Sequence, residues 1–338
     1  MEVYLHWTIT RLSHFRAASC IVANQLSTSL YQRIRRISLD ETDVDNYRSD
    51  YLFHRCEWFR ARVLCNIDAM VCKCGFKKLM HGEGAMKRTV LVVLAETIGT
   101  SILLFVGCMG CVGGLGSEPT PLQISLTFGL AVMIVIQSIG HISDAHINPA
   151  ITVGSVVLGK KTIPEGLVYL LSQIVGGILG FGMLKVVTPT GNLTSKTLSE
   201  ADMFCVTDLH SELSAIQGLL LEGISTAILM LVACAVWDSR NVKNTDSVPI
   251  RFGLTVAALA LAFGPYTGCS MNPARSLAPA LWNNQWSHHW IYWFGPIGGA
   301  LLSSFMYKTI FGVKNDTQDE CTAEAVALNS VNIQKTEP

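Results

Sequence analysis

Charged residues are scarce in this chain. They make up 15% of its 338 residues, whereas 50% are hydrophobic, and a soluble domain usually carries about 25% charged residues. Lys and Arg together number 25, as do Asp and Glu, so the formal net charge is zero. This balance argues against nucleic acid as a partner. The composition favours a protein embedded in a lipid bilayer.

Residue groups that carry enzymatic chemistry are also missing from the sequence. No nucleophile–base pair, metal-ligand cluster or phosphate-binding loop can be recognised, so we expect neither an enzyme nor a bound cofactor. Cys65, Cys72, Cys74 and His81 match no common zinc spacing, and disorder or lipidation explains them better. The eleven cysteines do not indicate a disulfide scaffold, which is typical of short secreted chains. We expect buried, reduced thiols at the cysteines in or beside apolar runs, which are Cys108, Cys111, Cys234 and Cys269.

Six apolar stretches are long enough, or nearly long enough, to cross a bilayer, which takes about 20 residues. The fifth is short unless it extends over residues 247–266. A soluble protein with six buried helices is the weaker alternative, because the stretches fill one compact region. The sequence therefore predicts an all-α membrane protein with spans at 89–111, 122–140, 167–187, 216–237, 250–263 and 290–311.

The two ends of the chain differ in composition from the region between them. Residues 1–85 are polar and contain no span, so we expect a poorly ordered extension. Residues 86–312 hold the six spans, and residues 313–338 form a polar tail. Arg11, His14 and Arg16 interrupt the apolar runs of the first thirty residues, which therefore do not resemble a signal peptide.

Lys and Arg near the span ends set the expected orientation, because cytoplasmic loops carry an excess of positive charge. The opposite loops carry few such residues, mainly Lys185, Lys196 and Arg275. They also hold Asn192, in an Asn-Leu-Thr acceptor triplet for glycosylation. Most of the positive residues near the span ends fall on one side of the membrane, and we expect this side, with both termini, to be cytoplasmic. These residues are Lys87, Arg88, Lys160, Lys161, Arg240, Lys243, Arg251, Lys308 and Lys314.

The spans form an internal repeat. The segment around Glu96 recurs around Glu222, Asn148-Pro149-Ala150 recurs as Asn272-Pro273-Ala274, and Gly176-Gly177 recurs as Gly298-Gly299. Each copy holds three spans, so the second copy enters the membrane from the opposite side. Inverted repeats of this kind place a functional site near the bilayer midplane, where broken helices meet.

Each Asn-Pro-Ala triplet precedes an apolar run that is too short to cross the membrane, at 151–158 and at 277–282. Asn is a favoured N-cap and Pro is favoured at the first helical position. We therefore expect two half-helices whose positive dipole ends face each other at the midplane. Asn148 and Asn272 can point side-chain donors at a passing oxygen there, in an arrangement that opposes cations.

The residues around both triplets resemble the signatures of the aquaporin family. Residues 140–152, with His146 before Asn148-Pro149-Ala150, resemble the first signature, and residues 267–276 resemble the second. The resemblance covers residues 88–312 and implies an aquaporin-like fold. It implies that Glu96 and Glu222 accept backbone hydrogen bonds beneath the two loops. Asp144 departs from the family, which usually has Gly there, and it either perturbs the loop or forms a hydrogen bond. Gly176, Gly180, Gly295 and Gly299 are expected to serve close helix packing.

The resemblance also implies an outer selectivity filter made of Phe128, Ala260, Cys269 and Arg275. Water-selective family members usually carry His where this chain has Ala260, and the smaller residue implies a wider, amphipathic filter. Ser276, Ala280, Tyr292 and Trp293 resemble the water-selective group instead. This mixture is similar to insect aquaporins that secondarily became glycerol-permeable.

The function implied is a passive channel for water and small neutral solutes such as glycerol and urea. Two alternatives stay open: a strictly water-selective channel, and a junctional or structural membrane protein of the same fold. The resemblance further implies a homotetramer with a pore in each subunit, located in the plasma membrane.

Overall fold

The structure is a computed structural model, and it describes residues 84–113, 118–189 and 204–312. The predicted extension and tail, the glycosylation acceptor Asn192 and the cluster around Cys72 lie almost wholly outside these residues. The first described helix begins at Ala85.

The described residues form long helices and two short ones, with no β-strand among them. The short helices are α6 (Pro149–Val157) and α10 (Pro273–Asn283), and a 3-10 turn, Ser239–Asn241, lies between α8 and α9. The all-helical prediction is therefore confirmed. The long helices are α4 (Ala85–Met109), α5 (Pro121–Ser143), α7 (Ile163–Val187), α8 (Ala215–Val236), α9 (Val248–Thr267) and α11 (Ile291–Ile310).

Five of the long helices, α4, α5, α7, α8 and α9, have the length and apolar composition of a membrane span. The fifth predicted span extends beyond 250–263 in both directions, as its length required. Helix α11 has 20 residues but carries Gly, Ser, Tyr and Lys among its apolar residues, and it falls outside that set of five. It packs along α8 just as α7 packs along α4, which makes it the third long helix of the second half.

Local sequence explains where several helices begin. Thr162 and Ser214 cap α7 and α8, and each forms a reciprocal capping box with the residue three positions later, Glu165 or Gln217. Thr120 caps α5 and is followed by Pro121 at the first helical position. Side-chain oxygens satisfy N–H groups that a helix start leaves unpaired.

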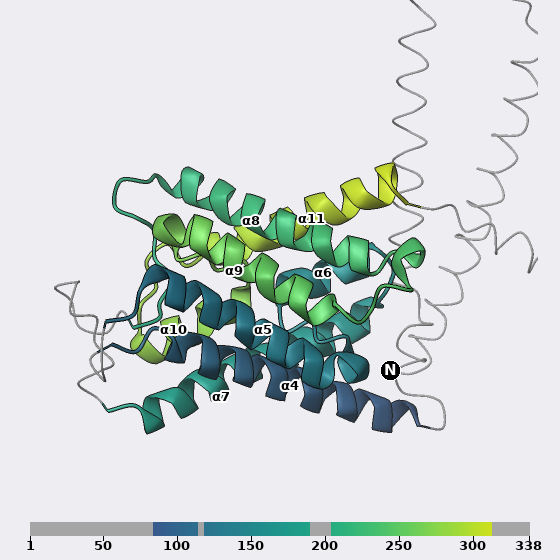
Figure 1. The fold of residues 1–338 in the computed structure, drawn as a ribbon, viewed down its shortest axis with the longest axis horizontal. Coiled ribbons are helices and arrows are strands. Elements are labelled where there is room, and N and C mark those ends of the chain that lie inside the picture. Colours follow the sequence, from purple (N-terminus) through teal and green to yellow (C-terminus); the bar gives the residue numbers. More distant parts are fainter. Residues whose placement is uncertain (1–83, 114–117, 190–203, 313–338) are drawn as a thin grey trace, which may run out of the picture. The chain divides into compact units, whose positions relative to one another are not determined.

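The two halves of the repeat pack against each other through α5 and α9 (Figure 1). Within the first half α4 packs against α5 and α7, and within the second half α8 packs against α9 and α11. The short helices cross between the halves, because α6 packs against α11 and α10 packs against α7. This exchange brings the beginnings of α6 and α10 together inside the bundle.

Glycine allows the long helices to approach closely. A Cβ atom on Gly180 of α7 would collide with the carbonyl oxygen of Ser101 on α4. A Cβ atom on Gly299 of α11 would likewise collide with the carbonyl oxygen of Gly223 on α8. The predicted packing role of these small residues is confirmed, because only glycine fits such backbone contacts.

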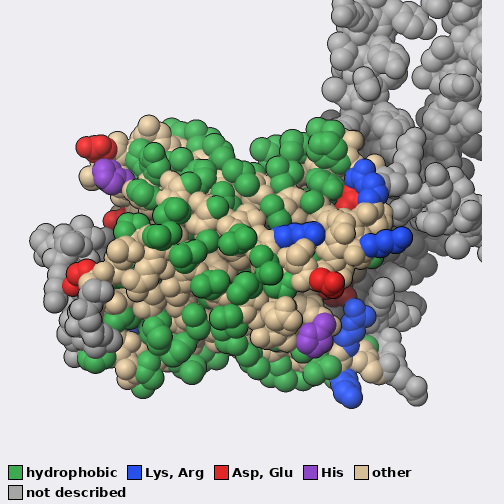
Figure 2. Space-filling view, viewed as in Figure 1, with side chains coloured by type: hydrophobic (Ala, Val, Ile, Leu, Met, Phe, Trp, Pro, Cys, Tyr) green, Lys and Arg blue, Asp and Glu red, His purple; other side chains and the backbone are tan. Residues whose placement is uncertain are grey.

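The outward faces of the helices are apolar. Large hydrophobic side chains such as Ile98, Leu171, Leu179, Ile224 and Leu302 are more than one-third exposed. Figure 2 shows hydrophobic side chains across the middle of the visible face, with Lys and Arg gathered near one end. This distribution suits a helical bundle surrounded by lipid.

Candidate functional site: the central pore

A cavity of about 510 Å³ runs through the helical bundle. Ser125, near the start of α5, and Asp144, just after its end, both line the cavity. The cavity therefore extends along most of the length of this helix. Its walls are mainly apolar and include Leu103, Val132 and Leu229. A few polar groups interrupt them, as expected of a path that orients small molecules.

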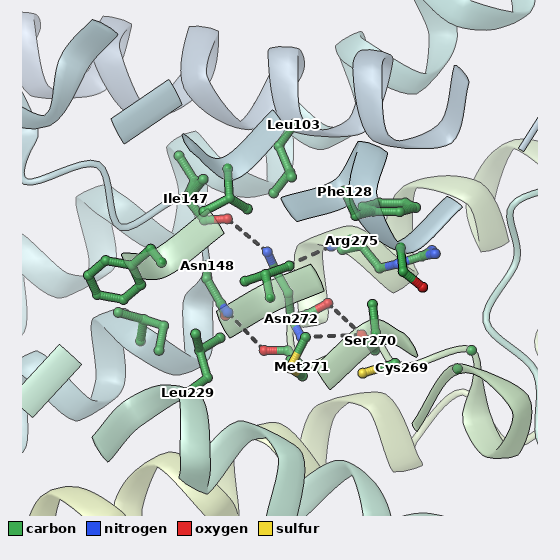
Figure 3. A pocket seen from close by; sticks show the side chains of 18 of the residues that line it. Leu103, Phe128, Ile147, Asn148, Leu229, Cys269, Ser270, Met271, Asn272 and Arg275 are labelled. Atoms are coloured by element: carbon green, nitrogen blue, oxygen red, sulfur yellow. Dashed lines mark hydrogen bonds between the residues drawn. The ribbon is translucent and has the colours of Figure 1, made fainter. Parts of the chain in front are cut away.

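Asn148 and Asn272 meet inside this cavity. The side-chain nitrogen of Asn148 donates to the carbonyl of Met271 at 2.8 Å, and that of Asn272 donates to the carbonyl of Ile147 at 2.8 Å (Figure 3). Each NH₂ group has two hydrogens, so one on each side chain remains for a group in the cavity. Both residues were predicted to face the pore, but the bonds that cross between their loops were not predicted.

Each asparagine also begins a half-helix. The Oδ1 atom of Asn148 accepts from the backbone of Ala150 at 2.8 Å, and that of Asn272 accepts from Ala274 at 3.0 Å. Pro149 and Pro273 occupy the first helical positions. The positive dipole ends of α6 and α10 therefore point to the place where the two side chains meet.

Two buried carboxylates hold the loops that lead to these helices. Glu96 accepts hydrogen bonds from the backbone of His146 at 3.0 Å and of Ile147 at 2.8 Å. Glu222 accepts from the backbone of Ser270 at 2.9 Å and of Met271 at 2.8 Å. Ser143 and Thr267 donate their hydroxyls to the same two carboxylates at 2.6 Å. The backbone contacts implied by the family resemblance are thus present in both halves.

All four residues expected in the outer filter line the cavity. The Arg275 guanidinium lies 4.6 Å from the centre of the Phe128 ring (Figure 3). Cys269 donates its thiol to the carbonyl of Leu259 at 3.4 Å, beside Ala260. This part of the cavity therefore combines one cation and one aromatic face with two small side chains.

The structure also identifies a residue that the sequence analysis missed. Cys205 forms a disulfide with Cys108, and its carbonyl accepts a 2.8 Å hydrogen bond from Nη1 of Arg275. The prediction of a reduced thiol at Cys108 is therefore wrong, because its partner lies 97 residues away in a segment outside the apolar runs. The buried, free thiols predicted at Cys234 and Cys269 are confirmed, whereas Cys111 is free but only partly buried.

Asp144 forms an ion pair at the other end of the cavity. Its Oδ2 atom lies 2.7 Å from Nζ of Lys161, which also lies 5.1 Å from the Tyr169 ring centre. Asp144 has φ 68°, a left-handed conformation that Gly adopts more readily. Of the two alternatives considered for this departure, the hydrogen bond is the one observed. The His146 ring lies beside Trp237 at the same end, with ring centres 5.3 Å apart.

Comparisons with known proteins agree with this geometry. The family model described as major intrinsic protein matches residues 85–307. The chain is 40% identical over 223 residues to aquaporin-4 of Mus musculus, and the aligned region covers 65% of this chain and 67% of that protein. It is 36% identical over 219 residues to aquaporin-2 of Rattus norvegicus, which covers 64% of this chain and 77% of that protein.

A solved structure has the same fold. The aquaglyceroporin from Plasmodium falciparum superposes with a TM-score of 0.60 at 22% identity, over 66% of this chain and 97% of that one. At this level of identity the likeness concerns the fold alone.

Proposed function

Since the chain belongs to the major intrinsic protein family, and is therefore a membrane channel and not an enzyme, we propose that it conducts glycerol and urea as well as water. The names of its relatives, aquaporin-4 and aquaporin-2, support the water component. The proposal for the larger solutes comes from this chain's own filter residues.

The observation that carries the proposal is the pairing of Arg275 with a small residue in the same part of the cavity. Arg275 offers fixed donors to hydroxyl or carbonyl oxygens, while Phe128 and Ala260 offer apolar surface. Glycerol presents hydroxyls on one edge and carbon on the other, so each edge meets a matching wall. Ala260 leaves space that a larger side chain would fill.

The centre of the pore provides the barrier to ions. Asn148 and Asn272 offer donors, and the starts of α6 and α10 add positive potential. A cation meets the same sign of potential at the centre and at Arg275, whereas a neutral molecule with an accepting oxygen is oriented and passed on. The proposal therefore concerns uncharged solutes only.

The mixture of a small filter residue with Ser276, Ala280 and Tyr292 supports a place among channels similar to the glycerol-permeable insect aquaporins. Ser276 is buried and bonded to Thr207 at 2.7 Å and to Ser270 at 2.6 Å. It thus helps to hold the outer loop and adds no charge to the filter.

We further propose that the end of the pore near Arg275 faces the cell exterior, with both termini in the cytoplasm. Two independent features support this orientation. Lys and Arg concentrate at the opposite end of the spans, and the Cys108–Cys205 disulfide lies near Arg275. Disulfides persist in oxidising compartments and are rare where cytosolic reductants act. A location in the plasma membrane fits both features.

We propose a homotetramer in which each subunit holds its own pore. The cavity lies inside one bundle, so the apolar outer faces are left for lipid and for neighbouring subunits. Mass measurement of the protein in lipid discs should give four copies per particle, and particles holding a single copy would contradict the proposal.

A solute panel tests the proposed function. Purified protein in liposomes would be exposed to osmotic gradients of an impermeant sugar, glycerol or urea, with empty liposomes as the control. We expect faster water, glycerol and urea movement than in empty liposomes. Water movement alone would leave a strictly water-selective channel, and no movement at all would favour the structural alternative.

A further inference from the structure

The Cys108–Cys205 disulfide joins helix α4 to a segment at the mouth of the pore. This mouth segment comprises residues 204–209, between α7 and α8. Cys108 lies in the last turn of α4 and is fully buried. Cys205 lines the cavity, and its carbonyl holds the guanidinium of Arg275 at 2.8 Å.

Hydrogen bonds fasten the mouth segment to helix α10 on either side of Cys205. Asn283 donates its side chain to the carbonyl of Phe204 at 3.0 Å, and the hydroxyl of Thr207 bonds to that of Ser276 at 2.7 Å. Helix α10 also carries Arg275. These bonds keep the segment near the arginine, and neither of them is made by the carbonyl of Cys205.

The direction of the Cys205 carbonyl depends on an unfavourable backbone conformation. Cys205 has φ 58°, in the left-handed region, which is unfavourable for a residue with a side chain. Such a conformation persists where the surroundings over-determine it. The disulfide is a covalent constraint at this residue, since it ties the Cα atom of Cys205 to that of Cys108 at 5.7 Å.

The same turn of α4 also supports the aromatic ring beneath Arg275. A Cβ atom on Gly107 would lie 2.5 Å from the Phe128 ring, so the ring packs directly against the α4 backbone. Gly107 thus contacts the ring, and the adjacent Cys108 anchors the carbonyl. One helical turn therefore sets both groups that hold the arginine.

We propose that the Cys108–Cys205 disulfide is a positioning element of the selectivity filter. It fixes the left-handed Cys205 so that its carbonyl holds Arg275 against the wall of the pore. The proposal rests on the proposed function where it concerns glycerol, and it stands independently where it concerns water.

Breaking the bridge has a definite consequence for the pore. Arg275 is only 7% exposed, and within the described residues its guanidinium donates one hydrogen bond, to the carbonyl of Cys205. A buried charged group that loses its acceptor must find another partner. Arg275 already lines the cavity, so we expect its side chain to move into the lumen. A narrower lumen obstructs glycerol more than water.

The test compares Cys108→Ala, Cys205→Ala and the double variant with the unmodified channel in liposomes, at equal protein density. We expect each to lower the glycerol-to-water permeability ratio by about tenfold, the effect of roughly one lost charged hydrogen bond. The double variant should match the single ones, because either change removes the whole bridge. Cys234→Ser is the matched control, since Cys234 is buried and free and does not line the cavity.

Three results would overturn the proposal. One is a glycerol-to-water ratio that is unchanged in all three variants. Another is an additive loss, larger in the double variant than in either single one. The last is mass spectrometry that finds Cys108 and Cys205 as free thiols in the unmodified protein. If the unmodified channel excludes glycerol, the proposed solute range is wrong, but the role proposed for the disulfide can still be tested. In that case the water permeability of the same variants should fall.

Reduction of the assembled channel covers the case in which the variants fail to fold. A phosphine reductant cleaves the S–S bond to two thiols and takes up one oxygen from water as phosphine oxide. In the fraction that mass spectrometry shows to be reduced at both cysteines, we expect the same fall in the ratio and its recovery on reoxidation. An unchanged ratio in that fraction would contradict the proposal.

Discussion

Asn148 and Asn272 each donate a hydrogen bond to the backbone carbonyl that immediately precedes the other. Asn148 donates to Met271 and Asn272 donates to Ile147, both at 2.8 Å. The two half-helices are thus linked at their starts by a symmetric pair of bonds. This link fixes the spacing of the donors at the centre of the pore, so it determines how the pore treats charge.

Asn272→Asp should make the pore conduct cations. The carboxylate keeps an oxygen for the cap of α10, but it removes the donor to Ile147 and places a negative charge where two dipole ends excluded cations. We expect a cation conductance that is absent in the unmodified channel, with water flow retained. Asn272→Ala is the control, because it removes the donor and the cap but adds no charge. Equal cation conductance in both variants would show that the loss of the donor, and not the charge, opens the path.

Gly299→Ala and the neighbouring Gly298→Ala should differ sharply in stability. A Cβ atom on Gly299 would collide with the backbone of Gly223, whereas one on Gly298 would meet no atom within 4 Å. We expect Gly299→Ala to cost about 1–3 kcal/mol or more. Gly298→Ala should be neutral or stabilising by about 0.5–1 kcal/mol, because Ala is the better helix former. Thermal unfolding in detergent, followed by circular dichroism, measures both, and equal midpoints would refute the close packing of α8 and α11.

Cys269 should be the cysteine through which mercurials block the pore. Its thiol lines the cavity beside Ala260, bonded to the carbonyl of Leu259. Cys111 also lines the cavity as a free thiol, but it follows the end of α4. We expect a mercurial to abolish most water flow in the unmodified channel and in Cys111→Ser, and to have little effect on Cys269→Ser. The reverse pattern would place the sensitive thiol at Cys111.

Asp238 should stabilise the loop between α8 and α9 at mildly acidic pH as well as at neutral pH. Hydrogen bonds from Arg240 hold the pKa of Asp238 well below its usual value of 3.8. A group whose pKa is lowered by folding stabilises the protein above its unfolded pKa, and that contribution is lost only as pH falls through the lower folded value. Asp238→Asn should therefore lower the thermal midpoint equally at about pH 5 and at about pH 7.4. A difference that vanishes at the lower pH would mean that Asp238 takes up a proton in that range.

The features that could be predicted from sequence are those fixed by local chemistry. Asn followed by Pro specifies a capped helix start, so α6 and α10 could be located from Asn148-Pro149 and Asn272-Pro273. Long apolar stretches located the helices that cross the bundle. The repeat then required the two short helices to enter from opposite sides, and the bonds between Asn148 and Met271 and between Asn272 and Ile147 show that their starts meet.

The features that could not be predicted depend on residues far apart in the chain. The Cys108–Cys205 disulfide needs two Cα atoms within bonding range across 97 residues, and no local pattern reports such a distance. The sequence left two alternatives open for Asp144, and its ion pair with Lys161 depends on the path of the chain after α6. The cross-bonds between Asn148 and Asn272 likewise follow from the meeting of two loops.

The central claim is that the small residue at Ala260 makes room for solutes larger than water, and Ala260→His tests it most directly. The ring would fill the space beside Arg275 and place a polar edge where the carbon side of glycerol passes. Water, glycerol and urea fluxes should be measured in liposomes at equal protein density. We predict that the glycerol-to-water and urea-to-water permeability ratios fall by about tenfold or more, while water flow is largely kept. A tenfold change requires a difference of about 1.4 kcal/mol in barrier height. Ratios that stay unchanged in Ala260→His would contradict the account and leave a plain water channel.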